Sequence, residues 1–431
     1  MNTTHFEQLL NHPDKETRLQ ALRELTALEP RPVPGTFVNN HIHTSYSFSP
    51  YSPCAAVYAA RKAGLATAGI IDHDSVGGCE EFTRAGTIAG MPVTIGFELR
   101  VRMDDTPLRG KRLNSPDQRS IAYVAAHGIP ASRLAACEAF LAPSRQHRNA
   151  RNRRMTERLN DLLEGTGLAL DFDRDILPLS RHADGGSVTE RHILCGLSLA
   201  IIEQTGRGAA AVDFLRGRMG ISLTAKVEAF LLDSENPHYL YDMLGALKSG
   251  LLPRFYIDAA DECPDVRAFI RFVNEIGAIG AYAYLGDVTD SVTGDKQAQA
   301  FEDGYLEELF DFLAQAGFHA VTYMPSRNTM EQLCRVMALC EAHGLFQISG
   351  EDINTSRQSF ICPALAQPAF RQLSSAAWAL IGHEAAANQR FANQRFEAGM
   401  FSAETLQKYP SLAQRIAVFE EMGKRAGTGN V

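Results

Sequence analysis

Short apolar runs alternate with amphipathic segments along most of this chain. The apolar runs, which are typical of buried strands, lie at 36–44, 66–72, 91–99, 251–259, 277–284, 319–325 and 345–350. Segments rich in Ala, Leu and charged residues separate most of them and predict helices at 54–63, 79–88, 264–276, 301–316 and 329–343. This order predicts an α/β fold with a parallel sheet, and about seven strands are enough to close a TIM-like barrel. An open doubly wound sheet is the alternative, but no glycine-rich phosphate loop follows these strands.

Helical stretches precede, interrupt and follow the predicted barrel. Residues 5–28 carry leucines at helical spacing, and the proline-rich stretch after them blocks the continuation of a helix. Between the third and fourth predicted strands lie about 150 residues that look mainly helical, and a loop of that length carries its own structure. The pattern therefore predicts four parts: an N-terminal helix and linker at 1–35, a barrel at 36–100 and 250–360, an inserted helical subdomain or lid at 101–249, and a helical C-terminal extension at 361–431.

Composition narrows the class of protein. The chain has 431 residues, of which 45% are hydrophobic and 21% charged, so it can bury a sizeable core and is not a disordered chain. The net charge of −8 argues against a dedicated nucleic-acid coat protein. Eight cysteines without a CxxC pair favour reduced thiols, and no apolar run has the length of a membrane span. We expect a soluble, cytoplasmic protein without a membrane partner.

Potential metal ligands stand at the ends of four predicted strands. In chain order they are His41 and His43, then Asp72, His73 and Asp74, then Glu98, and finally Asp352. Side chains two positions apart in a strand face the same side, so His41 and His43 can bind one ion. Catalytic groups of TIM-like barrels lie at this end of the strands, and His and carboxylate ligands suit Zn, Mn or Fe. The pattern predicts a divalent metal site, although each residue alone is also a normal turn or cap residue.

These motifs resemble those of the PHP (polymerase and histidinol phosphatase) superfamily of metal-dependent phosphoesterases. The matching segments are HIHTSYS at 41–47, GIIDHDSVGG at 69–78 and IGFE at 95–98. The resemblance covers the first three strands well and the last four weakly. It implies a distorted seven-stranded (β/α)7 barrel, up to three divalent metals and hydrolysis of phosphoesters.

Several positions depart from the family pattern. The acid that usually follows the HxH motif falls at Phe48, and Ala283-Tyr284-Leu285 replaces a late Ala-His-Pro motif. The closing Asp-x-His motif reads Asp352-Ile353-Asn354. The histidine that usually follows the GxE motif has no clear match; Ser120 lies near its place, and His127 is a stand-in.

The surviving ligands decide how many metals the resemblance implies. One metal position of the family keeps its full set, namely His41, His43, Glu98 and Asp352. The second position keeps only Glu98, and the third keeps only His73. We therefore expect one well-formed metal site, or one strong and one weak site.

Catalytic and substrate-binding candidates surround this set. A bound metal ion lowers the pKa of its water and polarises a phosphoryl oxygen. His73 or Asp72 could then carry a proton or orient the water, and Tyr284 could donate to a developing oxyanion, although core packing is the commoner role of such a tyrosine. The segment 189–194 resembles an Arg-Pro-His motif that the family carries in its insertion. For binding of a phosphate group we single out Arg191, His192, Arg327 and Asn354.

Other charged residues are open to two interpretations. Six arginines at 145–158 either bind phosphate or form a solvated helix face, and Lys248 and Arg254 are weaker candidates. An acidic loop at 258–262 would repel phosphate unless it is paired or binds metal. Asp287 and Asp290 are either replacement ligands or turn and cap residues.

Three hypotheses about function remain open. The first is a phosphoesterase that acts on a small phosphorylated metabolite or a short nucleotide, with the insertion as a lid. The second is an amidohydrolase-like enzyme with one metal, and the third is a non-catalytic binding protein on a degenerate site. Nucleic-acid binding would rest on the arginine run alone, so we do not expect it. The oligomeric state is not predicted.

Overall fold

A single mixed sheet organises the molecule. The computed structural model describes residues 3–30, 32–115, 117–288, 300–393 and 399–427. Within them, seven strands follow one another in the sheet in chain order: β1 (Val38–Ile42), β2 (Thr67–His73), β3 (Val93–Arg102), β4 (Ile121–His127), β5 (Ile279–Ala283), β6 (Ala320–Tyr323) and β7 (Phe346–Ser349). Neighbouring strands are parallel, except that β4 runs antiparallel to both β3 and β5.

The sheet nearly closes on itself where β1 meets the chain after β7. The His43 N–H donates to the Ile353 carbonyl at 3.0 Å, and the Ile353 N–H donates to the His41 carbonyl at 3.2 Å. Asparagine side chains join the same two segments, because Asn40 Nδ2 donates to the Ser349 carbonyl and Asn39 Nδ2 to the Glu351 carbonyl. The predicted α/β fold with a seven-stranded TIM-like barrel is therefore confirmed.

One predicted strand is wrong, and one strand lies outside the range predicted for the barrel. Residues 251–255 belong to the helix α9 (Tyr239–Phe255), and 256–265 contain no strand. Leu244, Leu247, Leu251 and Phe255 continue one buried helical face, so the apolar run is the last turn of a helix. The strand that completes the sheet in its place is β4, which had not been predicted and lies inside the range predicted for the insertion.

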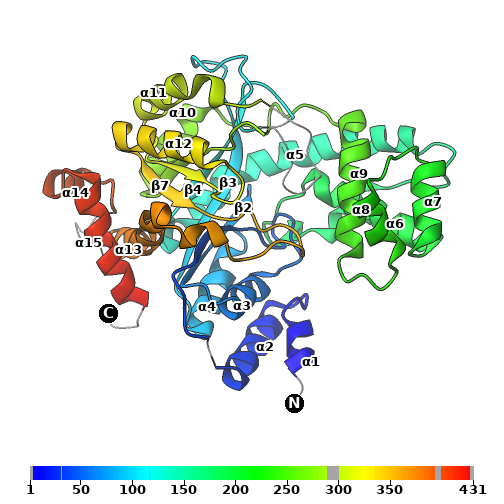
Figure 1. Ribbon diagram of the computed structural model, residues 1–431, viewed down its shortest axis with the longest axis horizontal. Helices are drawn as coiled ribbons and strands as arrows, with labels where there is room; N and C mark the ends of the chain where they lie inside the picture. Colours follow the sequence, from blue (N-terminus) through cyan, green and yellow to red (C-terminus); the bar gives the residue numbers. More distant parts are fainter. Residues whose placement is uncertain (1–2, 31, 116, 289–299, 394–398, 428–431) are drawn as a thin grey trace.

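Helices surround the barrel much as the amphipathic segments predicted (Figure 1). Those between the strands are α3 (Pro53–Lys62), α4 (Cys79–Ala89), α10 (Val266–Ile276), α11 (Leu306–Ala316) and α12 (Met330–His343). The C-terminal part forms α13 (Arg371–Asn393), α14 (Ala403–Lys408) and α15 (Leu412–Gly427), with α13 against β1, β3 and β7. Short 3-10 or π turns lie at Ala131–Arg133, Phe172–Ile176, Leu177–Leu179, His182–Asp184, Asp303–Tyr305, Pro363–Ala366 and Pro368–Phe370. None of the helices that the structure describes combines the length and apolar character that a membrane span requires.

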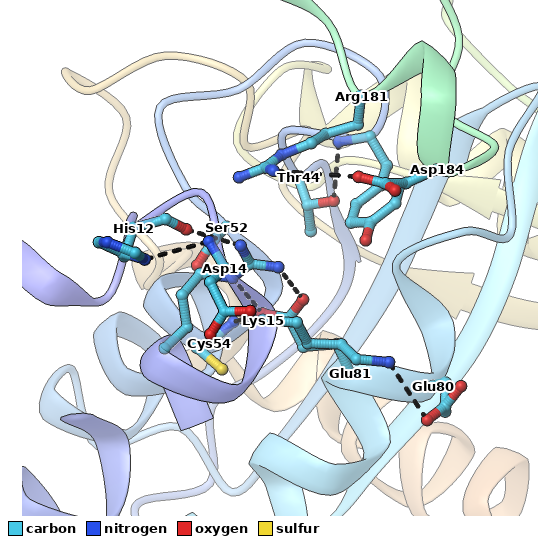
Figure 2. A network of polar contacts seen from close by, with 12 residues as sticks. His12, Asp14, Lys15, Thr44, Ser52, Cys54, Glu80, Glu81, Arg181 and Asp184 are labelled. Carbon is cyan, nitrogen blue, oxygen red and sulfur yellow. Dashed lines mark hydrogen bonds and ion pairs between the residues drawn. The ribbon is translucent and has the colours of Figure 1, made fainter. Parts of the chain in front are cut away.

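The expected single N-terminal helix is two helices, α1 (Thr3–Leu9) and α2 (Lys15–Leu28). Pro13 separates them, and the Asp14 side chain accepts from the Thr17 N–H and caps α2. Figure 2 shows this region, where α2 meets α4 through the ion pair of Lys15 with Glu80 at 3.5 Å. Arg18 and Glu81 form a second ion pair at 2.5 Å, and both side chains are buried. The N-terminal helices are therefore fixed to the barrel by charge as well as by apolar packing.

A separate group of helices, which we call the helical lobe (134–255), stands beside the barrel (Figure 1). Besides α9 it contains α5 (Leu134–Leu162), α6 (Glu190–Thr205), α7 (Ala209–Gly217) and α8 (Ala225–Leu232). The lobe has its own apolar core, which includes Leu159, Ile193, Leu197 and Leu247. The long helix α5 reaches from the barrel into the lobe.

Candidate metal centre

Five side chains from four strand ends meet at the carboxyl end of the barrel. Glu98, on β3, lies at their centre: its Oε1 is 2.9 Å from His73 Nδ1 and 3.3 Å from His43 Nε2, and its Oε2 is 3.5 Å from His41 Nε2. Asp352, after β7, places its Oδ1 3.1 Å from His43 Nε2. The structure therefore brings together His41, His43, His73, Glu98 and Asp352, as the strand ends predicted.

Two overlapping groups in this cluster could hold a metal ion. One is His41, His43 and Asp352, and the other is His43, His73 and Glu98. The nitrogen atoms His41 Nε2, His43 Nε2 and His73 Nδ1 are buried and make no hydrogen bond of good geometry. Both groups combine imidazole nitrogens with a carboxylate and share His43, and this is a donor set that a divalent transition metal fits.

The residues after β1 hold His43 from its other side. Asp72, at the end of β2, accepts hydrogen bonds from the Thr44 N–H at 2.7 Å, from Thr44 Oγ1 at 2.6 Å and from Ser47 Oγ at 2.6 Å. Ser47 Oγ is also 3.3 Å from His43 Nδ1, and an Asp72 oxygen lies 4.0 Å from the same nitrogen. Asp72 is thus a buried carboxylate that orders the loop carrying the HxH motif.

The charges of the cluster depend on each other. Burial alone would lower the pKa of His41, but the carboxylates of Glu98, Asp352 and Asp72 together more than offset this and raise that pKa to about 9. Burial would raise the pKa of Glu98, but His73 and His41 hold it well below its usual range. Burial would likewise raise the pKa of Asp352, and His43 keeps it low instead. The site thus keeps carboxylates ionised by facing them with positive charge, which is also what a metal ion would provide.

His127 lies near this cluster but in neither ligand group. It is the last residue of β4 and pairs with Gly96, so it faces the same side of the sheet as Glu98. It is buried, its Nε2 has no hydrogen-bond partner, and burial lowers its pKa to about 3. Ser120 lies in the loop before β4, where its hydroxyl accepts from the Gly110 N–H. A ligand role for His127 stays a prediction.

A small pocket opens beside His73. Its volume is about 310 Å³ when the open space at its mouth is included, and it is lined by Phe48, His73, Tyr123, Arg148, Thr189, Glu190, Arg191 and Asn354. Of the residues that we singled out for phosphate, Arg191 and Asn354 border it. Asn354 Nδ2 also donates to Asp352 Oδ1 at 2.6 Å, which connects the pocket to the metal centre. His192 is not in the lining: its Nδ1 accepts from the Thr189 N–H at 3.0 Å as part of the cap of α6.

Phe48 occupies the position of the missing family acid. Its ring is buried and meets the edge of the His192 ring at a centroid distance of 4.9 Å. Phe48 also packs near Tyr241 of the lobe. An apolar ring therefore lies where the resemblance would have placed an acid.

Other predicted residues make contacts away from the cluster. The Tyr284 hydroxyl donates to Asp303 at 2.6 Å, and the Arg327 Nε donates to the Leu285 carbonyl at 3.2 Å. Asp287 accepts from the Phe301 N–H, and Asp290 lies outside the described residues. The roles of Tyr284 and Arg327 stay predictions, and the Tyr284 proton is already directed at Asp303.

Sequence reasoning missed Tyr123, and it named Arg148 only as one member of the arginine run 145–158. Tyr123 faces the site because it pairs with Arg100 in the β3–β4 register, and the strand β4 had not been predicted. Arg148, together with Arg100 and Arg151, meets the buried carboxylate of Glu262, with nitrogen–oxygen distances of 3.3 Å for Arg148 and 2.6 Å for Arg151. Glu262 of the acidic loop is thus paired, and Arg145, Arg148 and Arg151 of the arginine run are buried rather than solvated.

Comparison with solved structures agrees with the barrel. A protein from Bifidobacterium adolescentis, provisionally named a metal-dependent phosphoesterase, matches with a TM-score of 0.50 and 20% identity, over 79% of this chain and 97% of that chain. At this identity the likeness shows the fold alone. An amidohydrolase from Chromobacterium violaceum has a TM-score of 0.49 and 18% identity, over 79% of this chain and 96% of that chain. No model of a known protein family matches the chain, and no curated protein matches it.

Proposed function

We propose that this chain is a hydrolase of small phosphate esters that works with one divalent metal ion, of which Zn, Mn and Fe suit the ligands. The observation that carries the proposal is the convergence of three imidazoles and two carboxylates at the border of a pocket that also contains arginines. The resemblance of the HxH, DH and GxE motifs to the PHP superfamily supports the same class of reaction.

The position of His43 supports the binding of one metal ion rather than two. Both possible ligand groups include His43, whose Nε2 faces Glu98 and Asp352, while its Nδ1 faces Ser47 and Asp72. One imidazole nitrogen has one lone pair and binds one ion. The two groups therefore describe alternative positions of one ion or a single site that combines them.

The residues divide into those that hold the ion and those that act beside it. A bound ion lowers the pKa of its water and polarises a phosphoryl oxygen. His41, His43, Glu98 and Asp352 would hold the ion. The His73 side chain is 25% exposed and borders the pocket, so it can bind the ion or carry a proton to the leaving group. Asp72, saturated by three hydrogen bonds, would orient His43 rather than move a proton.

Cations beside the pocket favour a phosphate group over an uncharged amide. Arg191 borders the pocket, and its charge is the largest cause that lowers the pKa of the neighbouring Lys248. Neither side chain forms an ion pair with any residue that the structure describes. Glu190, Asp117 and Asp352 also act on Lys248 through their charges, and Glu190 borders the pocket with Arg191. Two close cations still stabilise a bound anion, and Arg191 offers the planar geometry that suits phosphate.

A turnover assay with metal-supplemented protein tests the proposal. We expect hydrolysis of p-nitrophenyl phosphate, a loss of at least about 100-fold in kcat/KM for His43→Ala, and no change for His147→Ala, an exposed histidine of α5. Turnover of p-nitroacetanilide but of no phosphate ester would favour the amidohydrolase alternative. Retention of metal without turnover of either substrate would favour a binding protein.

A further inference from the structure

Two arginines of the run in α5 point back to one short turn of the barrel. This turn, 72–75, begins with the last two residues of β2, and the second of them is the candidate ligand His73. Arg145 Nη1 donates to the Asp74 carbonyl at 2.9 Å, and Arg148 Nη2 lies 3.0 Å from Asp74 Oδ2. Both arginines and Asp74 are buried. The helical lobe therefore contacts the backbone and the side chain of the residue next to His73.

Asp74 has an unusual backbone conformation. Its φ is +49°, and Ser120 is the only other non-glycine residue with a positive φ in the part of the chain that the structure describes. This left-handed conformation is unfavourable for a residue with a Cβ, so other contacts must maintain it. In addition, a buried carboxylate needs a positive partner, and Arg148 is that partner.

Further hydrogen bonds hold the turn 72–75 in place. The Asp74 N–H donates to the Glu98 carbonyl at 2.8 Å, and Ser75 Oγ donates to the Gly185 carbonyl of the lobe at 2.7 Å. Arg148 is itself fixed from behind, because its Nε lies 3.3 Å from Glu262. Since the turn sets the direction in which β2 ends, it also sets the position of His73, whose Nδ1 is 2.9 Å from Glu98.

We propose that Arg145 and Arg148 are positioning residues that hold the turn after β2, so that His73 faces the metal centre. This inference rests on the proposed function, because it takes His73 as part of the metal centre. It gives the arginine run a role other than binding nucleic acid or phosphate. The two residues are three positions apart, so they lie on the same face of α5.

The test measures metal affinity in the absence of substrate, because Arg148 also borders the pocket and would affect turnover directly. We expect Arg148→Met to weaken the binding of Mn²⁺ about tenfold in calorimetry, as is usual for a residue that orients a ligand. Arg154→Met, on an exposed position of the same helix, should leave the affinity unchanged. An unchanged affinity in Arg148→Met would overturn the proposal.

A double-mutant cycle shows whether the effect passes through His73. In a His73→Ala background, where the other four ligands remain, Arg148→Met should cause no further loss of Mn²⁺ affinity. The same tenfold loss in that background would mean that Arg148 acts elsewhere, and it would overturn the proposal. A lower unfolding temperature alone does not count in its favour, because loss of a buried ion pair lowers stability in any case.

A rescue variant tests the turn itself. Glycine adopts a positive φ without strain and carries no carboxylate that needs a partner. Asp74→Gly should therefore restore most of the affinity that Arg148→Met loses, whereas additive losses would contradict the proposal. Failure of the wild-type chain to bind Mn²⁺ would overturn both the proposed function and this inference. If the wild-type chain binds Mn²⁺ and Arg148→Met binds it with the same affinity, only this inference is overturned and the proposed function stands.

Discussion

Two carboxylates that belong to or contact β3, the buried Glu98 and the half-buried Glu384, behave in opposite ways. Glu98 belongs to the strand and faces three imidazoles. Burial would raise its pKa, but His73 and His41 hold that pKa well below the usual range. Glu384, on α13, accepts a hydrogen bond from the Ile95 N–H at 2.9 Å, and burial raises its pKa to about 8. No described cation forms an ion pair with Glu384, so it remains protonated near neutral pH.

The difference shows what makes a buried carboxylate a candidate ligand. Folding removes hydrating water from both carboxylates, but only Glu98 has positive groups around it that offset the lost hydration energy. A metal ion can replace the protons of the imidazoles around Glu98. Among the described residues no comparable donor set includes Glu384, whose hydrogen bond fastens α13 to the sheet.

The largest effect that we expect distinguishes these two residues by metal binding. Glu98→Gln removes the carboxylate that three imidazoles share, so Mn²⁺ affinity should fall by at least about 100-fold. Glu384→Gln should bind Mn²⁺ like the wild-type chain, because it preserves the carbonyl oxygen that accepts from Ile95. Calorimetric titration of both variants measures the contrast. Equal losses would show that the contrast between the two sites is wrong.

A second prediction concerns stability and pH. The pKa of Glu384 in the folded chain, about 8, lies above the ordinary value of 4.5, so the folded state keeps a proton that the unfolded state releases. Stability should therefore fall as the pH rises from about 4.5 to about 8. Glu384→Gln does not titrate and should be more stable than wild type by at most about 3 kcal/mol at neutral pH. Denaturant unfolding at pH 4.5 and 7.5 measures this, and an equal difference at both pH values would refute it.

The metal-centre residues could be predicted from the sequence because strand ends impose a local rule. His41 and His43 are two positions apart, and His73, Glu98 and Asp352 each follow an apolar run, so a parallel barrel brings them to one end. No knowledge of packing was needed. The separation of candidate ligands along the chain was irrelevant once the strands were identified.

The strand β4 and the arginine contacts could not be predicted in this way. Residues 121–127 lack a regular alternation of apolar and polar positions because both faces of β4 are largely buried. The contact of Arg145 with Asp74 joins residues 71 positions apart, and it depends on how the helical lobe packs against the barrel. Glu384 reaches β3 from 289 positions away. Local periodicity carries no information about such contacts.

A smaller effect tests how Asp72 differs from Glu98. Asp72 accepts three hydrogen bonds and stands behind His43, so Asp72→Asn should weaken Mn²⁺ binding about tenfold rather than abolish it. Glu384→Gln again provides the control. A loss as large as that of Glu98→Gln would mean that Asp72 itself binds the ion.

The smallest effect is the release of a proton when metal binds. The pKa of His41 is about 9 in the metal-free chain, so at pH 7 its ring carries a proton beside Glu98. That proton stabilises the metal-free fold below about pH 6.5, and its contribution is lost as the pH rises through about 9. A metal ion binds only the neutral ring, so binding at pH 7 should release about one proton, and the apparent affinity should rise with pH up to about 9. Calorimetry in buffers of different ionisation enthalpy measures this release. The control variant Glu384→Gln should release as many protons as the wild type, because Glu384 lies outside the metal centre. Metal binding without proton release at pH 7 would show that Glu98 does not hold the His41 proton.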